Sequence, residues 1–68
     1  MRFTIEIYSI NADDSESVLL RTFTDTISPT GARKEAQRLL NTWKTRKASG
    51  ARIINAQGQP VYSLAGNN

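Results

Sequence analysis

Three of the six carboxylates, Asp13, Asp14 and Glu16, stand close together in the sequence and are the first candidates for chemistry. Loop carboxylates can supply oxygen ligands to Mg²⁺ or Ca²⁺, which would make a small metal-dependent enzyme one interpretation of the chain. The segment lacks the alternating ligands and the fixed glycine of an EF-hand loop, and its small polar residues are typical of a solvated turn. We therefore predict that residues 11–17 form a hairpin loop and hold no metal or other cofactor.

The chain contains no histidine and no cysteine. These absences exclude imidazole bases, thiolate nucleophiles, disulfides, iron–sulfur clusters and cysteine-based zinc sites. Serine and threonine hydroxyls remain, but each needs a base to activate it. The four glycines are scattered along the chain, whereas a phosphate-binding loop gathers them. We expect no catalysis and no small-molecule substrate.

Charge is unevenly distributed along the chain. Residues 29–47 hold six cations and one carboxylate, whereas the other residues hold three arginines and five carboxylates, so the net charge of +3 conceals a basic segment. On a helix, one polar face of this segment would carry Arg33, Lys34, Gln37, Arg38, Asn41 and Lys44. Such side chains contact phosphates and base edges. The leading prediction is a non-catalytic binding domain that contacts nucleic acid or another polyanion; an ordinary solvated helix surface is the competing interpretation.

Two strands are predicted before the basic segment. Residues 2–10 alternate between apolar and polar types, with Phe3, Ile5 and Ile7 on one face, which is typical of a half-buried strand. Residues 18–27 alternate less regularly, which indicates a second strand with a bulge that shifts its frame. We expect Phe23 to be the core residue of this strand.

The basic segment itself is predicted to be a helix over residues 29–47. Ser28 suits the N-cap and Pro29 the first helical position, and Gly50 is expected to end the helix in a left-handed conformation. The apolar residues recur at helical spacing and would face the core; they are Ala32, Ala36, Leu39, Leu40 and Trp43.

A second hairpin is predicted over residues 51–64. Gln57-Gly58 separates two short apolar runs, and Gly58 can supply the positive φ of a tight turn. Pro60 has no N–H to donate to a ladder, so the last strand should lie at an edge of the sheet. Residues 65–68 are expected to fray.

These elements predict a single α+β domain over residues 1–64. The order β-β-α-β-β favours a two-layer sandwich, in which one helix covers one face of a four-stranded antiparallel sheet with strand order 2-1-3-4. The expected core comprises Phe3, Ile5, Ile7, Phe23, Leu39, Leu40, Trp43 and Ile53. Because this arrangement occurs in many unrelated small domains, the fold alone gives no function.

More apolar residues are present than one helix can cover. Adjacent pairs such as Ile53-Ile54 and Val61-Tyr62 place an apolar side chain on each face of a strand. The face away from the helix would then carry a patch of Tyr8, Ile10, Ile54 and Val61. A contiguous patch of this kind could join two copies of the chain. A homodimeric adaptor for protein–protein interaction is therefore the alternative function.

The longest apolar run is only three residues, so no membrane span is expected. The beginning of the chain alternates in residue type and lacks the apolar region of a signal peptide. A small secreted domain usually needs disulfides, which this chain cannot form. We expect a complete, cytoplasmic protein.

Overall fold

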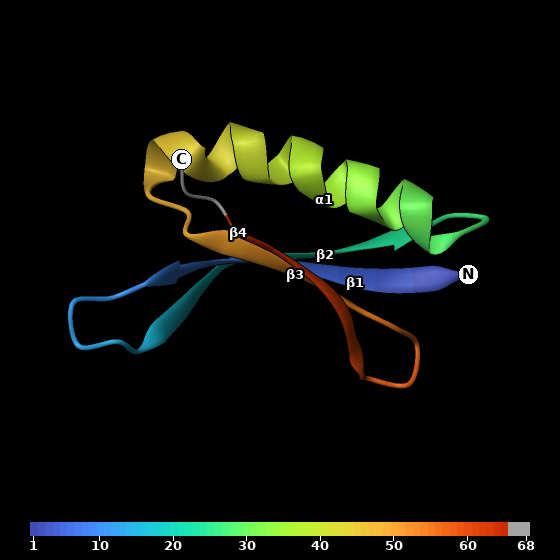
Figure 1. Ribbon diagram of the computed structural model, residues 1–68, viewed down its shortest axis with the longest axis horizontal. Helices are drawn as coiled ribbons and strands as arrows, with labels where there is room; N and C mark the ends of the chain where they lie inside the picture. Colours follow the sequence, from blue (N-terminus) through green and yellow to red (C-terminus); the bar gives the residue numbers. More distant parts are fainter. Residues whose placement is uncertain (66–68) are drawn as a thin grey trace.

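A four-stranded antiparallel sheet and a single helix are formed by residues 1–65, the part of the chain that the computed structural model describes (Figure 1). The elements in chain order are β1 (Arg2–Ile10), β2 (Glu16–Asp25), α1 (Pro29–Trp43), the short 3-10 helix η1 (Lys44–Arg46), β3 (Gly50–Ile54) and β4 (Pro60–Ala65). The strand order is β2-β1-β3-β4, so the predicted two-layer α+β sandwich is confirmed. Pro60 begins an edge strand, as expected.

The core lies between α1 and one face of the two central strands. Phe3, Ile5 and Ile7 of β1 are buried there, as their alternation predicts. Leu40 is fully buried on the helix, whereas Leu39 and Trp43 are half-buried and pack against the core from its margins. Small side chains complete the core and let helix and sheet approach closely; they are Ala32, Ala36, Ala48 and Ala51, beside Ile53.

Strand β2 contains the predicted bulge. Ile7 lies opposite Leu20 and Tyr8 lies opposite Val18, so Leu19 is the extra residue. The prediction that Phe23 belongs to the core is wrong, because its side chain is 58% exposed. Phe23 lies opposite Thr4, which points away from the helix, so the register turns the phenyl ring to the open face of the sheet.

The helix ends earlier than predicted. After Trp43 the chain tightens into η1, and Lys47, with φ of 66°, is the left-handed residue in place of Gly50. Gly50 instead begins β3, where a Cβ atom would lie 2.6 Å from the Leu64 carbonyl oxygen and 2.5 Å from the Tyr8 hydroxyl. Glycine is therefore required there by close approach. Pro29 does begin the helix, although Ser28 makes no side-chain capping bond.

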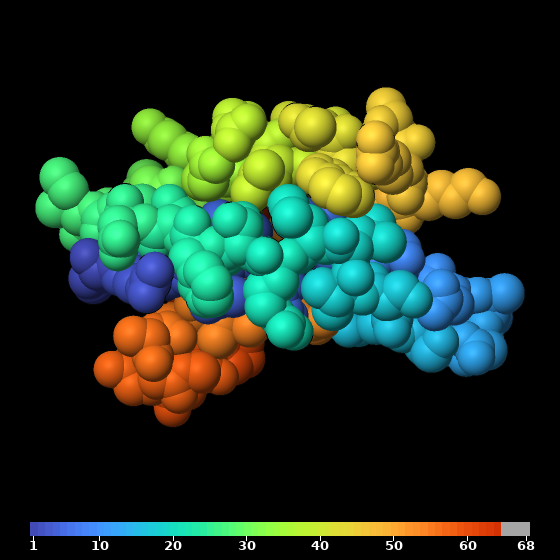
Figure 2. All heavy atoms as spheres, turned by 180° about the vertical axis from the view of Figure 1, so that it is seen from behind, coloured from blue at the N-terminus to red at the C-terminus, as the bar shows by residue number. Residues whose placement is uncertain are grey.

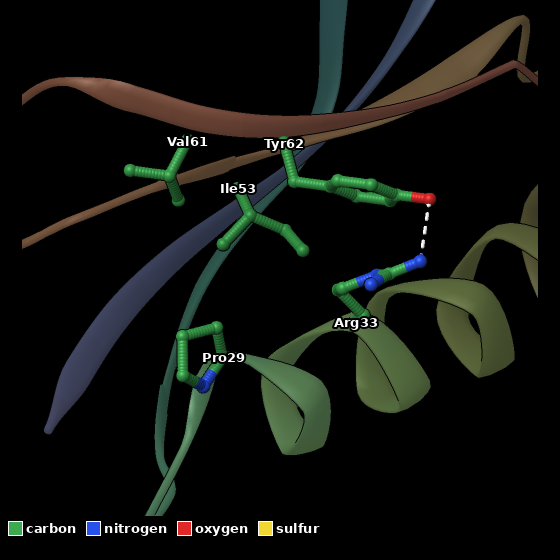
Figure 3. Close-up of a pocket in the computed structure, with 5 residues that line it drawn as sticks. All are labelled: Pro29, Arg33, Ile53, Val61 and Tyr62. Atoms are coloured by element: carbon green, nitrogen blue, oxygen red, sulfur yellow. Dashed lines mark hydrogen bonds between the residues drawn. The ribbon is translucent and has the colours of Figure 1, made fainter.

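The register of β4 decides which of its side chains face the helix. Tyr62 lies opposite Ile53 and Leu64 opposite Ala51, so both point toward α1. The register shifts between Ile53 and Ile54, and Val61 lines a hollow beside the helix (Figure 3). The expectation that Val61 shares the open face with Ile54 is therefore wrong.

The turn of the second hairpin contains Gly58 with φ of 82°, as predicted. Of the predicted frayed tail, Ala65 ends β4, and residues 66–68 lie outside the described residues. Within residues 1–65, no helix combines the length and the apolar character needed to cross a membrane.

Candidate polyanion-binding face

The six polar side chains predicted to form a binding surface lie on the exposed side of α1 and on Lys44, the residue directly after the helix. We call this surface the basic face; it comprises Arg33, Lys34, Gln37, Arg38, Asn41 and Lys44, all of which are exposed. The helix side chains form a ridge along the upper edge of the molecule (Figure 2). The buried stripe of alanines and Leu40 fixes this orientation, because it directs the opposite side of the helix to solvent.

Part of the basic face is neutralised within the helix. Arg38 donates two hydrogen bonds to the Glu35 carboxylate, one of them from Nε to Oε1 at 3.0 Å. The hydrogen bond from Arg38 is the main cause that lowers the pKa of Glu35 below its ordinary value. Gln37 donates to Asn41 at 3.1 Å, so these two amides partly satisfy each other. Arg38 is therefore less available to a ligand than its exposure indicates.

Arg33 is held in a fixed position by the edge strand. Its guanidinium carbon lies 4.0 Å from the centroid of the Tyr62 ring, and Nη2 donates to the Tyr62 hydroxyl at 2.8 Å (Figure 3). This contact joins Arg33 to a hydroxyl and an aromatic ring and brings no carboxylate to it. Arg33 thus remains a cation whose side chain is already ordered.

We call α1, η1 and Lys47 together the helix layer. Apart from Arg38, the cations of this layer have no acidic partner among residues 1–65. Within residues 1–65, no carboxylate lies within ion-pair distance of Lys34, Lys44, Arg46 or Lys47, and the same is true of Arg33. The Arg46 guanidinium lies over the Trp43 ring, 5.3 Å from its centroid. Five of the six cations in this layer therefore have no carboxylate partner within the described part of the chain.

The centre of the open face has the opposite character, because its charges are paired. The Glu6 carboxylate accepts from Arg21 Nε at 2.7 Å and from Arg52 Nε at 2.8 Å, and Arg52 also donates to Glu16 at 2.7 Å. Burial by itself raises the pKa of Glu6, but the hydrogen bonds and charges of the two arginines together outweigh it and lower this pKa. We call these four residues the Glu6 network.

The Glu6 network divides the apolar surface that the sequence assigns to a dimer interface. Arg52 and Glu6 separate Ile54 at one end of the open face from Tyr8 and Ile10 at the other. The Arg52 guanidinium also lies 4.8 Å from the centroid of the Tyr8 ring. With Val61 on the other side of the sheet, the four residues do not form one contiguous patch.

The acidic loop forms a turn, as predicted. Ser15 donates from its backbone N–H at 3.0 Å and from its hydroxyl at 2.6 Å to the Asp13 carboxylate, and these bonds lower the pKa of Asp13. Glu16 forms an ion pair with Arg52 and does not join Asp13 and Asp14. Among the described residues, no three acidic side chains gather where they could hold a metal ion.

The structure contains a groove between α1 and β4 that was not predicted from the sequence. It consists of two adjacent hollows that share Arg33 and Tyr62, and Figure 3 shows the smaller one. The alternation of Tyr62 and Leu64 is visible in the sequence, but only the strand register shows that both face the helix. The hollows therefore depend on a pairing that periodicity does not reveal.

Comparison of the chain with protein-family models, curated proteins and solved structures found no match.

Proposed function

We propose that the protein is a small non-catalytic binding domain that contacts the phosphates of nucleic acid through its basic face and the neighbouring Arg46 and Lys47. The observation that supports this proposal is the division of charge between the two layers. The helix layer holds five cations without a carboxylate partner among residues 1–65, whereas the arginines Arg21 and Arg52 of the open face are paired with Glu6 and Glu16.

Binding of this kind is driven by release of the counterions that surround a phosphate chain. Lys34 lies on the exposed side of α1 and Lys44 follows directly after its last residue, so a phosphate chain lying along the helix can meet both. With three or four phosphate contacts, affinity should be modest and should depend little on sequence, because sequence is recognised through base edges.

The test is a titration of the protein with fluorescently labelled oligonucleotides, single-stranded and duplex, over a series of salt concentrations. The logarithm of affinity should fall against the logarithm of salt with a slope of about −3 to −4 on duplex DNA and a smaller slope on single strands. Heparin should compete, since another polyanion presents similar charge. Absence of binding at about 50 mM salt would contradict the proposal and leave the basic face as a solvated surface.

The cytoplasm is the compartment we propose for this function. Its basis is the cysteine-free composition, which gives a domain of this size no disulfide to support it outside the cell.

A further inference from the structure

We infer that the groove between α1 and β4 receives an unstacked base of a single-stranded nucleic acid, next to the guanidinium of Arg33. This inference rests on the proposed function and extends it from contact with phosphates to recognition of a base. It adds three residues that do not belong to the basic face, namely Pro29, Val61 and Tyr62, which lie together near the start of α1 (Figure 3).

The smaller hollow is compact and mainly apolar. It has a volume of about 240 Å³ and is lined by Pro29, Arg33, Ile53, Val61 and Tyr62. Sites for drug-sized ligands usually measure about 300–1,000 Å³, so this hollow suits a single ring system. The proline ring, the two aliphatic side chains and the phenol give it apolar walls, and among the described residues of the lining Arg33 alone carries a charge.

The charge of Arg33 lies at the boundary between the two hollows. In Figure 3 the Arg33 guanidinium and the Tyr62 ring lie one against the other at the side of the hollow, joined by the hydrogen bond from Nη2. Arg33 belongs equally to the second hollow, of about 370 Å³, whose lining includes Lys34 and Gln37. A cation with no carboxylate partner among residues 1–65 therefore lies where an apolar space meets a polar, basic one.

These two spaces match the two parts of a nucleotide. A flat base can occupy the apolar hollow, while its phosphate lies by Arg33 and Lys34 in the basic one. Arginine planes and aromatic rings are the usual platforms for unstacked bases. The bases of a duplex stay stacked and paired, so only a single strand can place one here.

The test compares three labelled probes at low salt: an oligothymidine of about ten nucleotides, a strand of equal length in which all bases are removed, and a duplex. The wild-type protein should bind the thymidine strand at least about fivefold more tightly than the abasic strand. Arg33→Lys keeps the charge but loses the plane, so it should weaken binding of the thymidine strand far more than binding of the abasic strand or the duplex, and it should thereby abolish the difference.

Arg2→Lys is the matched control, because it makes the same exchange on the open face of the sheet, outside both hollows; the preference for thymidine should persist. Tyr62→Phe retains the ring and removes the hydroxyl that holds Arg33, so part of the preference should be lost. A urea unfolding midpoint close to that of the wild type establishes that each variant is folded.

Equal affinity of the wild type for the thymidine and abasic strands would overturn the base site and leave phosphate binding intact. An Arg33→Lys effect of the same size on both strands would have the same meaning. Absence of binding to all three probes would overturn the proposed function as well. Tighter binding of a ten-residue polyglutamate peptide than of oligothymidine would overturn the assignment of the groove to nucleic acid.

Discussion

Glu6 of β1 and Arg52 of β3 lie directly opposite each other on neighbouring strands, and Arg52 Nε donates to Glu6 Oε1 at 2.8 Å. Arg21 of β2 approaches the other carboxylate oxygen at 2.7 Å. The most buried charge of the described residues thus lies on the face that the helix leaves uncovered, where two arginines satisfy it. Because these contacts are charge-assisted and partly buried, they join β1, β2 and β3 more strongly than exposed pairs would.

The Glu6 network makes stability depend on pH. The pKa of Glu6 is lower in the folded chain than its ordinary value of 4.5. A group with a lowered pKa stabilises the folded state above its ordinary pKa, and this contribution is lost as pH falls through the lower value. We expect the free energy of unfolding, measured with urea, to decrease as the pH is lowered from about 6 to 3.

Glu6→Gln tests whether this residue causes the effect. The variant should lose about 1–3 kcal/mol at neutral pH, since two hydrogen bonds to a charged group are weakened. Its stability should also change less between neutral and acidic pH than that of the wild type. Asp13 and Glu35, whose pKa values are lowered too, should preserve part of the slope. An unchanged slope in Glu6→Gln would show that Glu6 does not contribute.

Leu40 should be the most sensitive position of the helix. Its side chain is fully buried, so Leu40→Ala should reduce the free energy of unfolding by about 2–5 kcal/mol. Leu39 is only half-buried beside it, and Leu39→Ala should therefore cost less. Equal losses in urea unfolding would contradict the burial described for these two neighbours.

Gly50 and Gly58 should respond differently to alanine. At Gly50 the added methyl group meets the Leu64 carbonyl oxygen and the Tyr8 hydroxyl, so β3, β4 or Tyr8 must move, and we expect a loss of about 1–3 kcal/mol. At Gly58 the space is open, but φ of 82° is unfavourable for alanine and should cost about 1–2 kcal/mol. A second mutation, Tyr8→Phe, should recover part of the stability lost in Gly50→Ala and none of the stability lost in Gly58→Ala. The free energy of unfolding in urea measures both effects.

The location of the phosphate contacts can be tested with two double variants of equal charge. Lys34→Gln with Lys44→Gln removes two cations from the helix layer and should reduce the magnitude of the salt slope by about two on duplex DNA. Arg2→Gln with Arg21→Gln removes the same charge from the open face and should leave the slope unchanged. Equal effects in the salt titration would show that net charge alone governs binding.

The sequence predicts the elements and strand order well, because β1, the α1 stripe and the Pro60 edge each follow from local periodicity or backbone chemistry. It fails at Phe23 and Val61, whose orientation depends on bulges and register shifts between strands. It also misplaces the left-handed residue, since Gly50 is needed for close packing and Lys47 takes the positive φ. Arg33 is identified from the sequence, but its Tyr62 partner depends on tertiary pairing.

The unequal charge of the two layers also gives the molecule an electric dipole. The helix lies over the sheet along the intermediate axis, over which the Cα atoms extend 21 Å (Figure 1). The Debye length at physiological salt is about 8 Å, so a polyanion near one layer acts mainly on that layer. Its field should rotate the approaching molecule until the helix faces it, before any side chain touches. Encounters at low salt would then be pre-oriented and fast, and added salt would slow association by removing this orientation.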